Sequence, residues 1–161
     1  MYYRFYYNFV YNNKSLIEQD RTEYVYEKII DEQINEYVSY AFETICKEYI
    51  IRLNMQDKLP FVARNIGKWW GTNNLTKSQE EIDVVAADDE SIIIVECKYT
   101  KNMVGVDVYE KVKKVGGMFS YKNMYYYIFS KNGFEKNLLD IAKKDNRFVL
   151  VTLNDIMKFE V

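Results

Sequence analysis

The sequence predicts an α/β domain with a mixed central β-sheet flanked by helices. The chain has 161 residues, of which 48% are hydrophobic and 29% charged, so it can fold as one domain with a proper core. Its first strand-like segments lie close together, which favours antiparallel pairing. The later ones alternate with helical segments, which favours right-handed parallel crossovers.

The helices and strands are expected from the spacing of apolar residues. A stripe at steps of three or four predicts a helix from near Asp31 to Leu53. The stripe consists of Ile30, Ile34, Val38, Phe42, Ile45, Tyr49 and Leu53. A short helix is expected before it, over residues 22–30. Strands are expected over residues 61–70, 82–86, 91–98, 125–129 and 148–153. A loop at 71–79 and an acidic turn at 88–90 separate the first three strands. The remaining helices are expected over 106–119 and 133–144, followed by a terminal turn capped by Asn154 or Asp155.

Several classes of function are excluded by composition. The chain has no histidine, so Ser-His and Cys-His nucleophile pairs and histidine zinc sites are absent. Its two cysteines, Cys46 and Cys97, have no metal-site spacing, and a reduced, cytoplasmic protein is expected. No apolar run approaches the length of a membrane span. The net charge of −2 argues against a strongly basic nucleic-acid binder.

A candidate site lies at the end of the most apolar strand. Ile92 to Val95 are apolar on both faces, as in a central strand, and Glu96 and Lys98 follow. Because side chains in a strand alternate, Glu96 and Lys98 share one face and the Cys97 side chain points into apolar packing on the other. Asp83 stands in the preceding strand, and the hairpin brings it beside Glu96. The alternative to a functional site is a structural ion cluster at the strand end.

These residues suit a hard cation. Carboxylates from Asp83 and Glu96, with the backbone carbonyl of Cys97, match the oxygen ligands preferred by Mg²⁺ or Mn²⁺. Such an ion can activate water and shield a phosphate, and Lys98 can orient that water or stabilise charge on phosphoryl oxygens. The pattern therefore predicts phosphodiester hydrolysis without histidine.

The same residues resemble the PD-(D/E)XK nuclease superfamily, in particular its DUF234 branch, found at the C-terminus of archaeal-type and bacterial ATPases. The resemblance rests on Asn13-Lys14-Ser15-Leu16-Ile17-Glu18, Phe42-Glu43-x-Ile45-Cys46, Ile66-Gly67-Lys68-Trp69-Trp70, Glu81-Ile82-Asp83-Val84-Val85, Glu96-Cys97-Lys98-Tyr99 and Phe129-Ser130-Lys131-x-Gly133-Phe134. It implies a restriction-endonuclease-like core and DNA as the substrate of an endonuclease or deoxyribonuclease. It also implies that Glu43, from the first long helix, joins Asp83, Glu96 and Lys98 as a catalytic residue; the alternative is a solvated helix glutamate.

The resemblance also bears on domains and partners. We expect an aromatic arm or linker over residues 1–20 and a nuclease-like domain over 21–161. Family members usually carry an ATPase and a winged helix upstream, so a partner of that kind is expected upstream or in trans. A non-catalytic DNA-binding or coupling module for such an ATPase is the rival hypothesis.

Three further groups of residues have alternative interpretations. The aromatic arm, rich in tyrosine and phenylalanine from Tyr2 to Tyr11, is expected to pack on the first helix or on a second copy of the chain. Core packing is favoured over base stacking for Trp69 and Trp70. A group of lysines is interpreted either as phosphate contacts or as a solvated face. That group consists of Lys111, Lys113, Lys114, Lys122 and Lys131.

Overall fold

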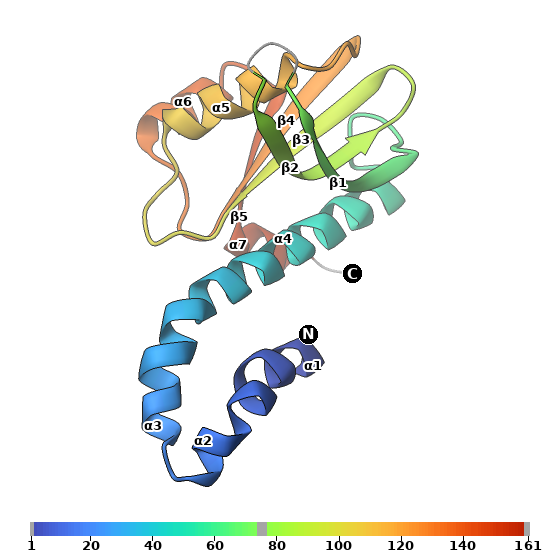
Figure 1. Cartoon of the computed structure of the whole chain (residues 1–161). Coiled ribbons are helices and arrows are strands. Elements are labelled where there is room, and N and C mark those ends of the chain that lie inside the picture. The colour runs from blue at the N-terminus through green and yellow to red at the C-terminus, as the bar shows by residue number, and fades with distance from the viewer. Residues whose placement is uncertain (1, 74–76, 160–161) are drawn as a thin grey trace. The chain divides into compact units, whose positions relative to one another are not determined.

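The computed structural model describes residues 2–73 and 77–159, so Met1, part of the expected loop at 71–79 and the last two residues lie outside it. The chain divides into two compact units after Ala41 (Figure 1). The sequence suggested a boundary after residue 20, with a nuclease-like domain over 21–161.

The first unit is built from short helical segments. In chain order these are α1 (Tyr2–Phe5), the π-helix η1 (Tyr6–Val10), the 3₁₀-helix η2 (Tyr11–Asn13), α2 (Lys14–Glu18), α3 (Thr22–Val25) and the π-helix η3 (Tyr26–Ile30). The long helix α4 (Asp31–Met55) begins in this unit and continues into the second. The expected short helix at 22–30 and long helix from Asp31 are confirmed.

The aromatic arm packs within the first unit. Phe9 is 1% exposed, and the rings of Phe5 and Phe9 lie 5.8 and 5.5 Å from the ring of Tyr37 on α4. Arg4 places its guanidinium 4.1 Å from the ring centre of Tyr40, a cation–π geometry. Burial of Phe9 confirms that the arm packs on the first long helix, as expected.

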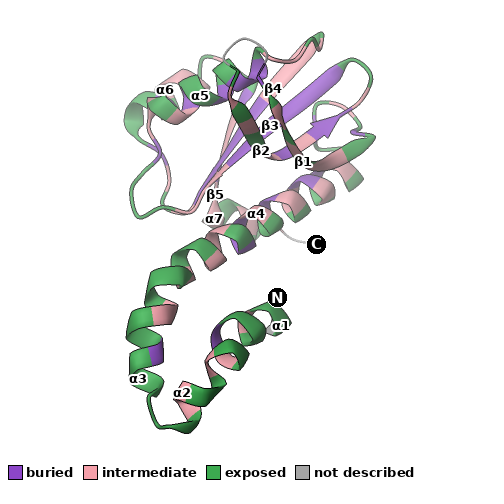
Figure 2. Cartoon of the chain, in the orientation of Figure 1, coloured by how far each residue is buried: buried purple, intermediate pink, exposed green. Residues whose placement is uncertain are grey.

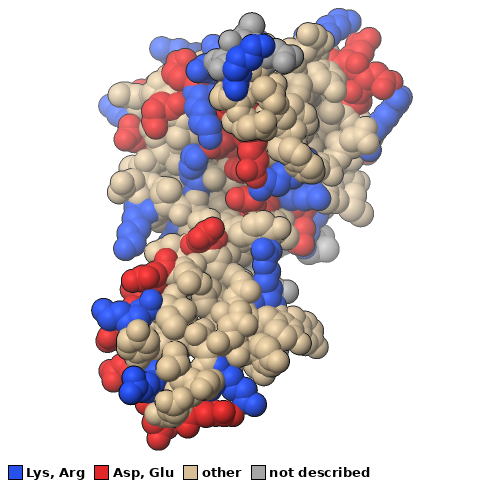
Figure 3. Space-filling view, viewed as in Figure 1, with Lys and Arg blue, Asp and Glu red and all other residues tan. Residues whose placement is uncertain are grey.

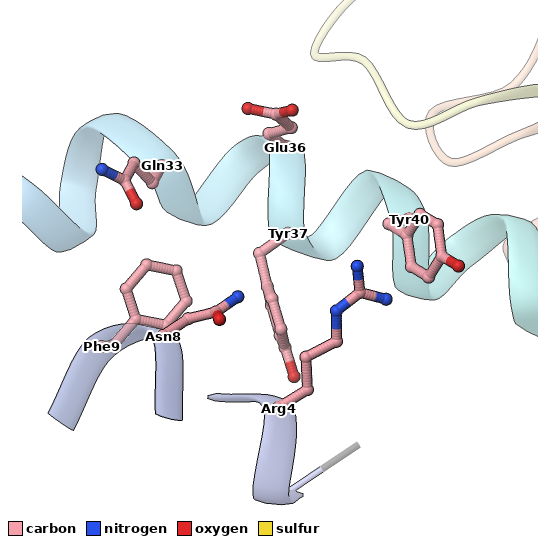
Figure 4. Close-up of a pocket in the computed structure, with 7 residues that line it drawn as sticks. All are labelled: Arg4, Asn8, Phe9, Gln33, Glu36, Tyr37 and Tyr40. Atoms are coloured by element: carbon pink, nitrogen blue, oxygen red, sulfur yellow. The ribbon is translucent and has the colours of Figure 1, made fainter. Parts of the chain in front are cut away.

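A hollow of about 240 Å³ lies between the arm and α4 (Figure 4). It is lined by Arg4, Asn8, Phe9, Gln33, Glu36, Tyr37 and Tyr40. None of the candidate catalytic residues belongs to its wall, so this cavity plays no part in the candidate site.

The second unit contains a five-stranded mixed sheet. The strands are β1 (Asn65–Thr72), β2 (Gln79–Ala87), β3 (Ser91–Lys98), β4 (Asn123–Ser130) and β5 (Phe148–Thr152), and they lie in that order across the sheet. The β1–β2 and β2–β3 pairs are antiparallel, whereas β3–β4 and β4–β5 are parallel. The expected α/β class, with a mixed central sheet, is confirmed.

Helices cover both faces of the sheet. On one face, Phe42, Cys46 and Ile50 of α4 pack with Val84, Val95 and other buried residues, and α7 (Leu153–Lys158) adds Leu153 and Ile156 to the same cluster. On the other face, α5 (Val106–Gly116) and α6 (Lys136–Ala142) pack on a cluster that includes Ile94 and Ile128. The central strand β3 is therefore buried from Ser91 to Glu96, as Figure 2 shows in purple.

The structure corrects three details of the sequence analysis. Phe42 and Leu53 of the expected stripe of α4 are buried and Tyr49 packs partly against the core, but Cys46 and Ile50, both fully buried, also face inward, whereas Ile45 is 39% exposed. The first strand begins at Asn65 rather than at residue 61. Thr152, not Asn154 or Asp155, caps α7, while Asp155 forms the other half of a capping box.

The segment from Phe129 to Phe134 serves the fold. Ser130 is fully buried and its hydroxyl donates to the carbonyl of Gly133 at 2.9 Å. Gly133 has φ +83°, a left-handed conformation in which a side chain would be strained. Phe134 is buried in the cluster beneath α5 and α6. This motif therefore supports the crossover after β4.

Candidate functional site

A β-bulge in β2 lies where the candidate site begins. Gly67 pairs with Val85 and Trp69 with Ile82, so the two residues Asp83 and Val84 stand opposite the single residue Lys68. Ile82 and Val85 consequently pack on the same face although they are three positions apart. A bulge redirects the side chains beside it and is common next to functional sites.

Asp83 is held at the end of β3. Its Oδ2 accepts the backbone N–H of Cys97 at 2.7 Å, which ties the bulge to the neighbouring strand. The pKa of the Asp83 carboxyl is raised to about 6 in total. Burial is the largest cause of the increase and the negative charges of Glu96 and Glu43 add to it, whereas the N–H of Cys97 and the charge of Lys98 lower the pKa. The folded protein therefore keeps this carboxylate at an electrostatic cost that a nearby cation would relieve.

Glu96 is the most enclosed charged group of the site. It is 6% exposed, and its Oε1 is 2.7 Å from Nζ of Lys98 and 2.8 Å from Nζ of Lys111. The contact with Lys98 confirms that the two residues share one strand face. Two ammonium groups on one oxygen offset the cost of burying the carboxylate.

Lys111 is the site residue whose contact with Glu96 the sequence did not indicate. It comes from α5 and donates to Glu96. Burial lowers its pKa, but the hydrogen bond and the charge of Glu96 outweigh burial and raise the pKa overall. The spacing of α5 could have indicated that Lys111 lies near the sheet, because Lys111 follows Val108 by three positions and precedes Val115 by four, at the edge of the inward stripe.

Glu43 lies near Asp83 but is engaged elsewhere. Its Oε2 is 3.3 Å from Nζ of Lys68 on β1, and Lys68 also pairs with Glu81. The hydrogen bond to Glu81 is the largest cause of the raised pKa of Lys68. Glu43 thus acts on Asp83 through its charge, and its role as a catalytic residue stays a prediction.

Cys97 faces away from Glu96, as expected. Its side chain packs with the cluster beneath α4, and a hydrogen bond with the thiol of Cys46 is the main cause of its raised pKa, followed by burial. Cys97 is nevertheless half-buried rather than inaccessible, because it lies near the end of its strand. Ile93 and Val95 are fully buried, as expected.

The two tryptophans differ in environment. The ring of Trp69 lies 5.1 Å from that of Phe119 in an edge-on contact, so core packing is confirmed for Trp69. Trp70, on the edge strand β1, is 75% exposed, and the expectation that it also packs in the core is wrong. Trp70 pairs with Glu81 across the β1–β2 ladder.

The oxygen atoms of the site suit a hard divalent cation, but the number of side chains that could bind the cation is small. Within residues 2–73 and 77–159, no group of three or more His, Cys, Asp or Glu side chains is arranged to hold a metal ion. Mg²⁺, however, is commonly held by one or two carboxylates with several waters and substrate oxygens. Asp83 and Glu96 supply two carboxylates, and burial, together with the negative charges of Glu96 and Glu43, raises the pKa of Asp83. The residues therefore fit a cation that keeps part of its water shell.

Charge is mixed on the surface around the sheet. Figure 3 shows Lys and Arg interspersed with Asp and Glu on the face drawn, without a continuous basic area. Among the described residues, no helix has the length and apolar character needed to cross a membrane.

The fold and the site together define an α/β protein whose central strand ends in a buried carboxylate clamped by two lysines. The chain belongs to DUF234, a family described as archaea bacterial proteins of unknown function, which it matches over residues 6–115. It is 32% identical over 120 residues to the uncharacterized protein MJECL04 of Methanocaldococcus jannaschii. That match covers 70% of the chain and 25% of the relative, so the chain spans about a quarter of that protein's length.

Solved structures resemble the fold at low sequence identity. Protein VC1899 from Vibrio cholerae has a TM-score of 0.54 at 19% identity, covering 71% of this chain and 30% of that one. The DNA modification-dependent restriction endonuclease AspBHI has a TM-score of 0.38 at 14% identity, covering 72% of this chain and 33% of that one. The first likeness concerns the fold alone, and the second is too weak to support an inference about function.

Proposed function

We propose that the chain is a metal-dependent nuclease that hydrolyses phosphodiester bonds, with DNA as its substrate. The observation that carries this proposal is that Asp83 of β2 accepts the backbone N–H of Cys97, next to Glu96 on the adjacent strand β3, and feels the charge of Glu96, while Lys98 pairs with the Glu96 carboxylate. The order of acidic residue, then Glu-x-Lys, on neighbouring strands is the core of the PD-(D/E)XK resemblance. This resemblance supports the proposal of a restriction-endonuclease-like core.

Each residue has a proposed role. Asp83, Glu96 and the backbone carbonyl of Cys97 would hold Mg²⁺ or Mn²⁺, which would supply Lewis acidity and lower the pKa of water. Lys98 would orient the attacking water and stabilise charge on the phosphoryl oxygens. Glu43, which pairs with Lys68, would join the site from α4 as a further carboxylate near Asp83.

The test uses the purified chain with DNA of several shapes. With Mg²⁺ or Mn²⁺ the chain should nick or degrade DNA, and EDTA should stop the reaction. Lys98→Ala should lower the rate by about 100-fold or more, as the loss of one charge-stabilising group commonly does. Lys143→Ala is the matched control, because Lys143 is an exposed lysine on α6 that pairs with Asp140 at 3.5 Å and lies outside the lysine group considered for phosphate contacts, and its rate should be unchanged. DNA that stays intact with either metal would refute the proposal.

The rival function is a non-catalytic DNA-binding or coupling module for an ATPase. One observation favours it: the two lysines on Glu96 already compensate its buried charge, as in a structural ion cluster. Calorimetry separates the two, because the nuclease proposal requires a divalent cation to bind the intact chain and to fail to bind Asp83→Ala. An ATPase or winged-helix partner and a twofold dimer remain proposals.

A further inference from the structure

Two loops lie together at the carboxyl ends of β3 and β4. These two strands are parallel, so the loops that follow them leave the sheet at the same edge, where β3 ends in the candidate site. The loops lie side by side in Figure 1, in yellow and orange. We call them the strand-end surface, which consists of residues 99–105 and 131–134. Ligands of open α/β sheets commonly bind outside the carboxyl ends of the strands.

Hydrogen bonds hold the two loops to each other. The backbone N–H of Lys131 donates to the carbonyl of Lys98 at 3.1 Å. Next to it, Nδ2 of Asn132 donates to the carbonyls of Thr100 and Lys101, at 2.9 Å in each case. The backbone that carries the lysines is therefore braced against the end of β3, and a ligand bound there would have little chain to order.

The strand-end surface is basic in its own sequence. Residues 97–106 and 129–134 contain no aspartate or glutamate. They contain three lysines, which are Lys98, Lys101 and Lys131. The acidic residues that follow the two segments, Asp107 and Glu135, both direct their carboxylates toward Gly105 at one end of the surface. Positive charge is therefore gathered at the strand ends, beside the candidate site.

Two of these lysines are available to an anion. Within residues 2–73 and 77–159, neither Lys101 nor Lys131 forms an ion pair with a carboxylate, whereas Lys98 is engaged by Glu96. The ammonium of Lys131 lies 4.3 Å from the ring centre of Tyr99, a cation–π contact that leaves its other side open to a second partner. Lys101 is exposed. An anion would therefore compete with no protein carboxylate for either lysine.

We propose that the strand-end surface binds the phosphate backbone of DNA, with Lys101 and Lys131 as the phosphate contacts. The proposal rests on the proposed function for the identity of the partner, and it adds the surface that holds the strand beside Asp83 and Glu96. A lysine is a flexible point charge that suits phosphate and releases counterions when it neutralises one. Contacts of this kind position the backbone without reading the base sequence.

The test measures the affinity of the whole chain for a labelled DNA duplex as a function of salt, by fluorescence anisotropy. EDTA is present throughout, so neither cleavage nor a bound cation contributes. Each lost phosphate contact makes the slope of log affinity against log salt shallower by about 0.9. The double variant Lys101→Gln/Lys131→Gln should therefore have a slope shallower by about two than that of the wild type.

The matched control is Lys143→Gln/Lys144→Gln. It removes the same charge from two exposed lysines at the end of α6, on the way to the amino end of β5 and away from the strand-end surface. Its slope should equal that of the wild type. Equal slopes in the two double variants would overturn the proposal.

Two further measurements separate charge from structure and DNA from other anions. Lys101→Arg/Lys131→Arg keeps both charges and should keep the wild-type slope; a slope as shallow as that of the glutamine variant would show a structural role and overturn the proposal. Poly-glutamate should displace the DNA poorly. Displacement at the same concentration of charge as unlabelled DNA would indicate an acidic protein partner and overturn the assignment of DNA.

Cleavage, measured separately with Mg²⁺ or Mn²⁺, distinguishes this inference from the proposed function. A chain that binds DNA through Lys101 and Lys131 but never cleaves it would refute the nuclease and leave the strand-end surface standing. A chain that cleaves DNA while both double variants keep the wild-type slope would support the nuclease and overturn the strand-end surface.

Discussion

Replacing Asp83 with asparagine should stabilise the metal-free protein. Asparagine has nearly the same shape, and its side-chain oxygen can still accept the N–H of Cys97 that Asp83 binds at 2.7 Å. What it removes is a buried negative charge lying near Glu96 and Glu43. Functional residues often cost stability in this way, so their replacement by neutral residues commonly stabilises the fold.

The sign of the pH dependence follows from the direction of the shift. The pKa of Asp83 is raised from an ordinary value of 3.8 to about 6 in the folded chain, chiefly by burial. Between these two pH values the folded state therefore binds more protons than the unfolded state. The free energy of unfolding of the protein accordingly falls, on account of Asp83, as pH rises from about 4 to about 6. Above pH 6 the cost is complete and constant.

The magnitude can be worked from the same shift. A difference of about two pKa units corresponds to about 3 kcal/mol of unfolding free energy, and partial exposure of Asp83 makes this an upper value. For a chain of this length, 1 kcal/mol changes Tm by roughly 2–4 °C. Asp83→Asn should therefore raise Tm by several degrees at pH 7.5 and leave it nearly unchanged at pH 4.

The assay is thermal unfolding of both proteins from pH 4 to pH 8, with and without Mg²⁺ or Mn²⁺. The difference in Tm between variant and wild type should grow between pH 4 and pH 6 and then level off. The cation should raise Tm of the wild type but not of the variant. At a cation concentration of 100 times Kd, binding should add about 2.7 kcal/mol to the free energy of unfolding of the wild type. A variant that is less stable than wild type at pH 7.5, or a difference independent of pH, would refute the assignment of a strained carboxylate.

Two further changes test the fold. Phe9→Ala should destabilise the first unit by about 3 kcal/mol or more, because it empties a fully buried ring position. Tyr7→Ala removes a half-exposed ring from the same segment and should cost little. Unfolding in denaturant followed by helical circular dichroism compares the two variants, and equal losses of stability would contradict the packing of Phe9 on α4. Thr152→Ala should lower the free energy of unfolding by about 1 kcal/mol, because it removes the capping box with Asp155. Thr152→Ser keeps the capping hydroxyl and should retain the wild-type stability in the same denaturation assay. Equal stability of the alanine and serine variants would contradict a role for the cap.

The sequence alone is enough to predict the fold class and the strand that carries the candidate site. The apolar run from Ile92 to Val95 predicts a strand buried on both faces, and the alternation of side chains predicts that Glu96 and Lys98 share one face. Both features are present in the structure. These predictions succeed because they depend on local periodicity, which the backbone geometry of a strand enforces regardless of its neighbours. The helical stripe of α4 was less exact, since apolar residues at several helix positions allow more than one inward face.

Only the tertiary structure decided how the charges are paired. The bulge that places Asp83 and Val84 opposite Lys68 depends on strand register, which sequence spacing does not specify. The contacts of Lys111 with Glu96 and of Glu43 with Lys68 join residues from separate helices and strands. The raised pKa of Asp83 likewise arises from burial and from charges that are distant along the chain. Local sequence patterns determine which groups are available, whereas packing determines which of them share one charge environment.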